Sequence, residues 1–248
     1  MLGLEVDLAS PWMNAAGTLG FAPPARWPLP ESPGAFVTNP ISLTPRAPAA
    51  GRALVSFPGG FLLHSGHPNP GLNRVLRRYA ARWAQSSLPV WVHLLASDPD
   101  EIRTMAQRLE GVEGVMALEI GLPPGLRGAE AQEWIQAAYG ELPLVVCLPL
   151  TMVEEPWVAE LPRWGAGAVC LSAPRGILVD SAGRPVNGRL YGPALLPQLL
   201  AAIHAARRLG LQVIAGAGLY RPQDAQLARE AGAAAVQLDA VLWRGWAS

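Results

Sequence analysis

The sequence predicts an α/β protein that folds as a single (β/α)₈ TIM barrel over residues 1–248. Its length of 248 residues suits such a barrel, which takes about 250 residues. Half of the residues (50%) are hydrophobic, enough for a large core. From Leu88 onward, short β-rich runs alternate with helical stretches, as expected where each strand is followed by a crossover helix. The same alternation of strands and helices also fits an open doubly wound sheet, which is the alternative to a closed barrel.

The strand-like segments are nearly continuous apolar runs, which is typical of parallel strands buried on both faces. Six of them lie at residues 90–95, 114–120, 144–148, 168–171, 212–215 and 235–238. Two earlier candidates, at 11–15 and 35–38, bring the total to the eight that a closed barrel needs.

Helical patterns occupy residues 98–109, 132–139, 156–164, 195–209 and 222–231. Residues 22–33 are rich in proline where a first helix is expected, and residues 40–68 read as a long Pro/Gly-rich loop. After Leu238 only ten residues remain, so the C-terminal helix should be truncated. Trp243 and Trp246 are then available to cover the last face of the barrel or to meet another subunit.

Charge, apolar run length and cysteine positions limit the partners and the cellular compartment that we expect for this protein. The formal net charge is zero and no basic run exceeds two arginines, which argues against nucleic acid and anionic membranes as partners. No apolar run has the length of a membrane span, and the first residues lack the pattern of a signal peptide. We therefore expect a cytoplasmic protein. Cys147 and Cys170 lie in apolar strands and are expected to be buried thiols.

The chain contains no lysine, because all of its basic residues are arginine. Arginine keeps its proton near neutral pH, so it forms no Schiff base and serves poorly as a proton donor. Schiff-base chemistry is therefore excluded.

Four segments carry a resemblance to a known family. They are residues 14–21 (NAAGTLGF), 34–46 (GAFVTNPISLTPR), 58–72 with its PGGFL and NPGL parts, and 188–195 (GRLYGPAL). In their order and spacing they resemble the dihydroorotate dehydrogenase family over nearly the whole chain. The last segment is similar to the turn and helix start that precede the family's seventh strand.

The resemblance implies flavin-dependent oxidation of dihydroorotate in pyrimidine biosynthesis, with FMN at the carboxyl ends of the strands. It also implies a lysine near the flavin, a Cys or Ser base, and asparagine amides on the substrate. Glycine-rich turns should offer N–H groups to the phosphate. The positions it assigns to the cofactor are Ala16, Gly17, Asn39, His93, Gly192, Gly216 and Gly218. Asn69 falls in the loop that borders the substrate.

Many catalytic positions nevertheless differ from the family pattern. Asn39 and Cys147 stand where the family has lysines, and Leu63 replaces a substrate-binding asparagine. Gly121 replaces an amide, and the prolines after it offer neither a donor nor a base. Asp239 follows the last strand where a Gly-Thr or Gly-Ser pair is expected, and its carboxylate would repel a phosphate.

Some polar residues allow other chemistry. His93 and Glu119 both point into the predicted barrel, either as an acid–base couple or as a satisfied buried pair. His64 and His67 lack a nearby carboxylate and are read as loop histidines, so we predict no metal. The candidate anion anchors, which are equally consistent with solvated charges, are Arg46, Arg52 and Arg189.

Taken together, these residues predict a degenerate family member with lost or much altered flavin chemistry, which binds a small molecule or a protein partner. The alternative is an active FMN-dependent oxidoreductase in which His93, Glu119 or Asn39 handles the substrate. A further alternative is an FMN-free phosphate-binding barrel enzyme. The sequence leaves open the ligand, the oligomeric state, a homo-oligomer included, and whether a partner subunit supplies missing groups.

Overall fold

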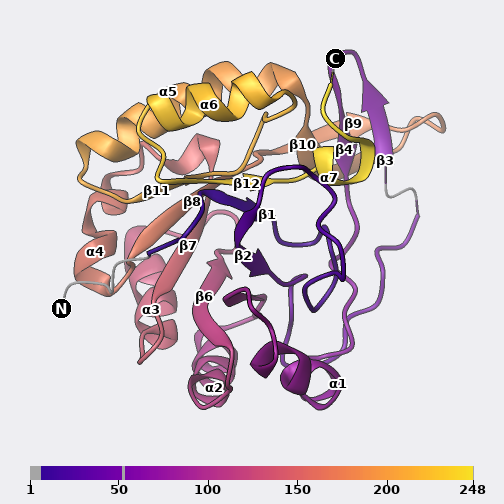
Figure 1. Ribbon diagram of the computed structural model, residues 1–248. Helices are drawn as coiled ribbons and strands as arrows, with labels where there is room; N and C mark the ends of the chain where they lie inside the picture. Colours follow the sequence, from indigo (N-terminus) through magenta and orange to yellow (C-terminus); the bar gives the residue numbers. More distant parts are fainter. Residues whose placement is uncertain (1–6, 52–53, 248) are drawn as a thin grey trace.

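A closed barrel of eight parallel strands forms the centre of the computed structural model, which describes residues 7–51 and 54–247 (Figure 1). Around the barrel the strands follow the order β1, β12, β11, β8, β7, β6, β5, β2. Each neighbouring pair runs parallel. The predicted (β/α)₈ TIM barrel is therefore confirmed, and the open sheet is excluded.

All eight predicted strand segments form barrel strands. Their bounds are β1 (Trp12–Asn14), β2 (Pro33–Val37), β5 (Val90–Leu94), β6 (Val115–Gly121), β7 (Leu144–Pro149), β8 (Ala168–Ser172), β11 (Val213–Ala215) and β12 (Ala235–Leu238). One face of each strand points into the barrel and the other packs against the surrounding helices, which explains the continuous apolar runs.

The barrel interior is a separate, mostly apolar core. Its members come from all eight strands: Met13, Ala35, Val37, Trp91, Ala117, Val145, Cys147, Ala168, Cys170, Ile214 and Ala235. Four of these residues are alanines, and their small side chains leave room for the large ring of Trp91, which is 2% exposed. This packing closes the interior and makes the barrel a filled core.

The helices form an outer layer around the barrel. They are α1 (Leu72–Ala84), α2 (Pro99–Glu110), α3 (Gly128–Ala138), α4 (Leu161–Trp164), α5 (Leu196–Arg208), α6 (Pro222–Glu230) and α7 (Val241–Arg244). Asp98 caps α2 by accepting the N–H of Glu101 at 2.9 Å, and Pro99 occupies the first turn. The five predicted helical stretches are confirmed, although residues 156–160 form a 3₁₀ turn before α4. No helix links β1 to β2, as the prolines there predict.

A second, four-stranded antiparallel sheet stands at one end of the barrel, at the upper right of Figure 1. It contains β3 (Leu54–Phe57), β4 (Gly60–Leu63), β10 (Pro185–Tyr191) and β9 (Arg175–Val179) in the order β3, β4, β10, β9. The prediction of a loop over residues 40–68 is wrong for β3 and β4. Residues 188–191, expected to form a turn, belong to β10.

Two glycines allow the strands of this sheet to approach each other closely. A Cβ on Gly60 would lie 2.0 Å from the carbonyl oxygen of Tyr191, and one on Gly188 would lie 2.5 Å from that of Leu63. Both strands therefore need glycine at these positions. The hydrogen bonds between β4 and β10 join two parts of the chain that are distant in sequence.

The four-residue helix α7 and the residues after it cover one side of the barrel. The indole of Trp246 packs edge-on against that of Trp12, with ring centroids 6.3 Å apart, and Trp243 donates its indole N–H to the carbonyl oxygen of Thr18. Both tryptophans thus pack against the β1 side of the barrel.

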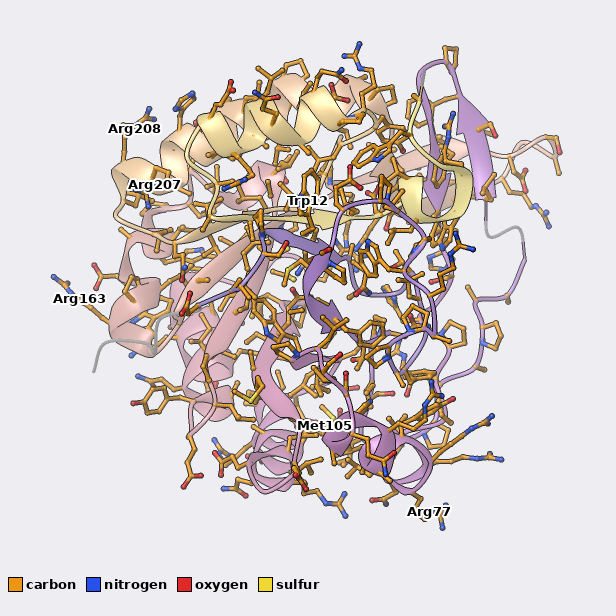
Figure 2. The ribbon with its side chains drawn as sticks, viewed as in Figure 1. Trp12, Arg77, Met105, Arg163, Arg207 and Arg208 are labelled. Carbon is orange, nitrogen blue, oxygen red and sulfur yellow. The ribbon has the colours of Figure 1, made fainter. Side chains whose placement is uncertain are left out.

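Several arginine side chains project from the outer helical layer. The arginines Arg77, Arg163 and Arg208 point away from the helices, whereas Met105 of α2 is fully buried (Figure 2). Among the described residues, no helix combines the length and apolar character needed to cross a bilayer.

Candidate functional site

A cavity of about 90 Å³ lies at the carboxyl ends of the barrel strands, beside the second sheet. Its floor consists of inward-facing barrel residues: His93, Glu119, Cys147, Cys170 and Gln237. Its walls come from the loops after the strands and from the second sheet: Ala15, Ala16, Gly17, Thr18, Pro40, Leu63, Ser65, His67, Ser172, Ala173, Arg189, Tyr191, Gly216, Asp239 and Trp243. This is the end of a barrel at which such folds place their sites.

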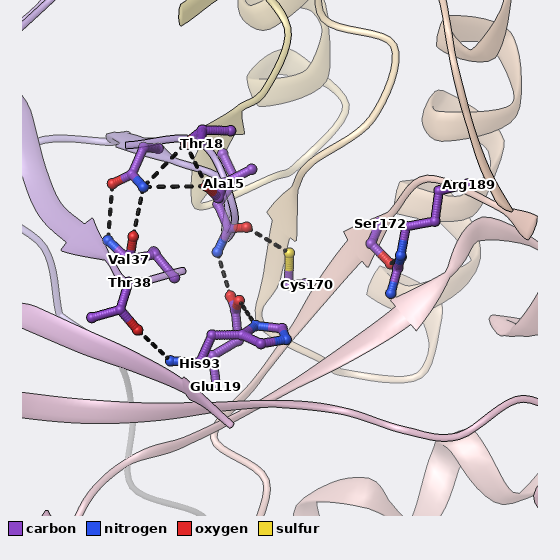
Figure 3. A network of polar contacts seen from close by, with 11 residues as sticks. Ala15, Thr18, Val37, Thr38, His93, Glu119, Cys170, Ser172 and Arg189 are labelled. Carbon is purple, nitrogen blue, oxygen red and sulfur yellow. Dashed lines mark hydrogen bonds and ion pairs between the residues drawn. The ribbon is translucent and has the colours of Figure 1, made fainter. Parts of the chain in front are cut away.

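Glu119 is the centre of a buried polar network on this floor (Figure 3). Its Oε1 lies 2.6 Å from Nδ1 of His93, and its Oε2 accepts a hydrogen bond from Nε2 of Gln237. The thiol of Cys170 donates to Oε1 of Gln237 at 3.2 Å. The network therefore joins four side chains from β5, β6, β8 and β12.

The environment favours a charged pair at His93 and Glu119. Burial alone lowers the pKa of His93, but hydrogen bonding with Cys147 and Glu119 outweighs it and raises the pKa to about 9. Burial alone raises the pKa of Glu119, but the hydrogen bond with His93 and its charge keep it below the ordinary value. At neutral pH the pair is an imidazolium next to a carboxylate.

The wall opposite this pair is formed by Arg189 of β10. Its Nη1 donates to Oγ of Ser172 at 3.0 Å and to the carbonyl oxygen of Ala173 at 3.2 Å. Burial and the charge of Arg189 lower the pKa of His67 to about 3, so that imidazole is neutral. The Arg189 guanidinium therefore places a positive charge on this wall. Ser172 of β8 and the adjacent Ala173 hold it in place.

Comparison with known proteins defines the ancestry of this barrel. The chain is 31% identical to the catalytic subunit of dihydroorotate dehydrogenase B (NAD(+)) of Trichlorobacter lovleyi, over 94% of this chain and 84% of that protein. The protein of the same name from Pelobacter propionicus is 29% identical, over 96% of this chain and 84% of its own. The chain belongs to the dihydroorotate dehydrogenase family. A scan against models of protein families finds no match.

With membership of the dihydroorotate dehydrogenase family shown, the FMN that the resemblance implies can be compared with the residues in place. Cofactor pockets commonly enclose roughly 300–1,000 Å³, whereas this cavity measures about 90 Å³. Leu63 and Tyr191 are among the side chains that line it. Gly192 is absent from its rim.

The end of the cavity that would receive the FMN phosphate carries a carboxylate. Asp239 is 5% exposed, and burial raises its pKa to about 7. The N–H of Ala240 donates to Oδ1 of Asp239, and the N–H of Gly216 donates to the carbonyl oxygen of Leu171 at 2.9 Å. These two backbone donors are therefore already engaged, beside an acidic group that repels a phosphate when it is ionised. The residues at this end do not fit FMN.

The structure brings several of the predicted site residues together. Ala16, Gly17, His93, Glu119 and Gly216 all line the cavity. Gly17 has a φ of 90°, a conformation that favours glycine, at the exposed lip of the cavity.

The other predicted residues support loops outside the cavity lining. Asn39 accepts the N–H of Gly20 through Oδ1 at 3.0 Å. Asn69 accepts hydrogen bonds from Ser42 and from the N–H of Gly71, and donates to the carbonyl oxygen of His67. These bonds use both ends of the Asn69 amide, so it fixes the fold of its own loop.

Gly192 and Gly218 have packing roles. A Cβ on Gly192 would lie 2.2 Å from the carbonyl oxygen of Gly59, and one on Gly218 would lie 2.6 Å from the backbone nitrogen of Leu196. The absence of a side chain at Gly192 therefore lets the turn between β3 and β4 pack closely against it, and Gly218 does the same for the start of α5.

The remaining candidates are spread over the molecule. Arg46 pairs by its backbone with Asn69, and His64 is exposed, whereas His67 lines the cavity. Arg52 lies outside the described residues.

Sequence reasoning missed Cys147, Cys170 and Gln237 as site residues. It treated the cysteines as inert core and gave Gln237 no role. The two-residue period of the strands carried a signal, because Cys147 shares a strand face with Val145, and both belong to the barrel interior. Whether these side chains meet at the same level along the barrel axis depends on the register between strands, and a single sequence does not reveal that register.

Proposed function

We propose that this chain is a dihydroorotate dehydrogenase-family barrel that has lost flavin-dependent dihydroorotate oxidation and binds a small anionic ligand. The observation that carries the proposal is the buried carboxylate of Asp239 at the phosphate end of a cavity of only about 90 Å³. The absence of lysine from the chain adds support, because the resemblance implies a lysine near the flavin.

Arg189 supplies the reason to propose an anionic ligand. Its guanidinium lines the cavity and is oriented by Ser172 and Ala173 through a single nitrogen, Nη1. Guanidinium groups bind carboxylates through paired N–H donors. The cavity size restricts the ligand to a small molecule, and the His93–Glu119 pair would contact it from below.

The decisive measurement is the visible absorption spectrum of the purified chain, followed by titration with FMN. We expect no flavin band, no saturable change on adding FMN, and no reduction of an electron acceptor with dihydroorotate. A flavin band that survives desalting, or stoichiometric FMN uptake, would overturn the proposal. It would then favour the active FMN-dependent oxidoreductase, with His93 or Glu119 as its acid–base group.

Ligand binding is tested by thermal unfolding with small carboxylates, orotate and dihydroorotate among them. Binding should raise the unfolding temperature of the unmodified chain. Arg189→Gln should abolish the increase, whereas Arg208→Gln, a change on the exposed end of α5, should preserve it. Equal increases in both variants would remove Arg189 from the site. Stabilisation by inorganic phosphate instead of carboxylates would favour an FMN-free phosphate-binding enzyme.

Assembly and location form part of the proposal. The relatives are named catalytic subunits, which supports a protein partner or a homo-oligomer for this chain as well. Both cysteines are free and buried, which supports the reducing environment of the cytoplasm. Sedimentation of the purified chain and affinity capture from its source would identify the assembly.

A further inference from the structure

The floor of the cavity gathers metal-binding side chains from four consecutive strands of the barrel. His93 pairs directly with Glu119 across β5 and β6, and Cys147 pairs with Cys170 across β7 and β8. Gly121 joins the two pairs, since it stands two residues after Glu119 and opposite Cys147. All four polar side chains are less than 9% exposed.

Three of the four potential ligands in this cluster converge. One ligand atom each from His93, Glu119 and Cys147 lies within 4.8 Å of the others. Cys170 is not one of these three, but it stands directly opposite Cys147 across β7 and β8, which makes its sulfur a further candidate ligand. Such a set differs from the His64 and His67 pair, on which the sequence-based expectation of no metal rested.

The two nitrogens of His93 have different neighbours. Nδ1 faces Glu119, whose other oxygen is held by Gln237. Nε2 faces Gly121, where a Cβ would lie 3.4 Å from it, and Gly121 is the register partner of Cys147. The carboxylate therefore holds the ring by Nδ1 and leaves Nε2 on the side of Gly121, the strand neighbour of Cys147, as carboxylates do behind metal-bound histidines.

We propose that Nε2 of His93 and the sulfurs of Cys147 and Cys170 bind one Zn²⁺ ion, with Glu119 positioning the imidazole. Two thiolates and an imidazole suit Zn²⁺, whereas Mg²⁺ and Ca²⁺ prefer oxygen ligands. Binding releases the thiol protons and the ring proton at Nε2. The fourth position faces the cavity, so a water molecule or a small anionic ligand completes the tetrahedron.

This site stands apart from the loss of flavin chemistry, because it uses only residues of the cavity floor. A positive FMN titration would overturn the proposed function and leave the metal proposal to its own test. A hydrogen-bonded core without a metal would satisfy the same side chains, and that reading predicts no uptake.

The test is a titration of the chelator-treated, folded chain with Co²⁺, followed by competition with Zn²⁺. We expect one ion per chain, a near-ultraviolet charge-transfer band from thiolate to Co²⁺, and visible bands typical of tetrahedral Co²⁺. Zn²⁺ should remove these bands, and elemental analysis after desalting should find one zinc per chain. A folded chain that takes up no stoichiometric metal, or shows no thiolate band, overturns the proposal.

Variants separate the roles of the residues. Cys147→Ala and Cys170→Ala should each reduce the thiolate band by about half and weaken binding on the order of 100-fold, and Glu119→Gln should weaken it about 10–100-fold. His204→Gln, on the exposed face of α5, should bind like the unmodified chain. Unchanged affinity in both cysteine variants would refute the assignment. If either variant fails to fold, the spectrum of the unmodified chain still decides whether sulfur binds the metal.

Discussion

Nδ1 of His93 and Oε1 of Glu119 lie 2.6 Å apart, on residues that stand directly opposite each other in β5 and β6. Both side chains are buried, at 7% and 0% exposure. Burying such a pair costs desolvation free energy, which the attraction between the two close charges offsets. Loss of one partner therefore leaves the other charge buried and uncompensated. The stability of the barrel should therefore depend on the pair being complete.

Glu119→Gln in the metal-free chain should lower the free energy of unfolding by about 3 kcal/mol, because it removes the counter-charge of a buried imidazolium. Denaturant unfolding measures the difference. Glu133→Gln on the exposed face of α3 is the matched control and should change stability by less than about 0.5 kcal/mol. Equal stability of the two variants would show that the pair contributes nothing.

Asp239→Asn should change how stability depends on pH. Burial raises the pKa of Asp239 to about 7, whereas an unfolded aspartate has a pKa of about 3.9. The folded state holds the proton more tightly, so its stability is fully present below about pH 4 and falls as the pH rises to about 7. The variant should lose this decline and be more stable at pH 8, by up to roughly 4 kcal/mol.

Urea unfolding at pH 4.5 and pH 8 tests this prediction for Asp239. The control is Asp100→Asn, which replaces an exposed carboxylate of α2. If the free energy of unfolding depends on pH in the same way in the Asp239 variant and the unmodified chain, the folded state does not raise the pKa of Asp239, and this contradicts the prediction.

Both thiols of the metal-free, folded chain should resist alkylation. Hydrogen bonding to Cys170 and burial raise the pKa of Cys147 well above the ordinary value. Hydrogen bonding to Cys147 lowers the pKa of Cys170, but burial and the nearby Glu119 carboxylate together raise it. Labelling should be roughly 100-fold slower than in denaturant, where both cysteines react. Rapid labelling of a folded, chelator-treated sample would place a reactive thiolate in the cavity.

Gly60→Ala should separate β4 from β10. The added Cβ would lie 2.0 Å from the carbonyl oxygen of Tyr191, so one of the two strands has to move. We expect a loss of about 2 kcal/mol in the free energy of unfolding, typical of overpacking, together with a wider cavity. Gly111→Ala is the matched control, because nothing lies within 4 Å of its Cβ position and its φ is −92°. Similar stabilities would contradict the close approach.

The barrel was predictable because its strands are continuous apolar runs separated by helices, and that pattern survives in a single sequence. The second sheet was not, because β4 and β10 form their pairs across a long separation in sequence. Residues 40–68 contain the glycines and prolines of loops, and residues 188–191 begin with a glycine; pairing between the two segments overrides that local signal.

For the site, the alternation of side chains along each strand predicted only which residues point into the barrel. His93 and Glu119 were expected to point inward, and the structure brings them into contact. Asn69 and Gly192 were assigned to the site through family resemblance; neither lines the cavity, and in the structure Asn69 fixes loop conformation and Gly192 allows close strand packing. The grouping of Cys147 with His93 depends on the stagger between strands, and no periodicity along one strand records it.

The pairing of β4 with β10, and of β1 with β12, has a consequence for synthesis of the protein. The ribosome produces β1 and β4 early, whereas their partners belong to the last third of the chain. Until that part emerges, the early strands expose unpaired edges on which nascent chains can associate wrongly. The cavity is therefore enclosed only near the end of translation, and any ligand or metal that it holds has to enter a nearly finished chain.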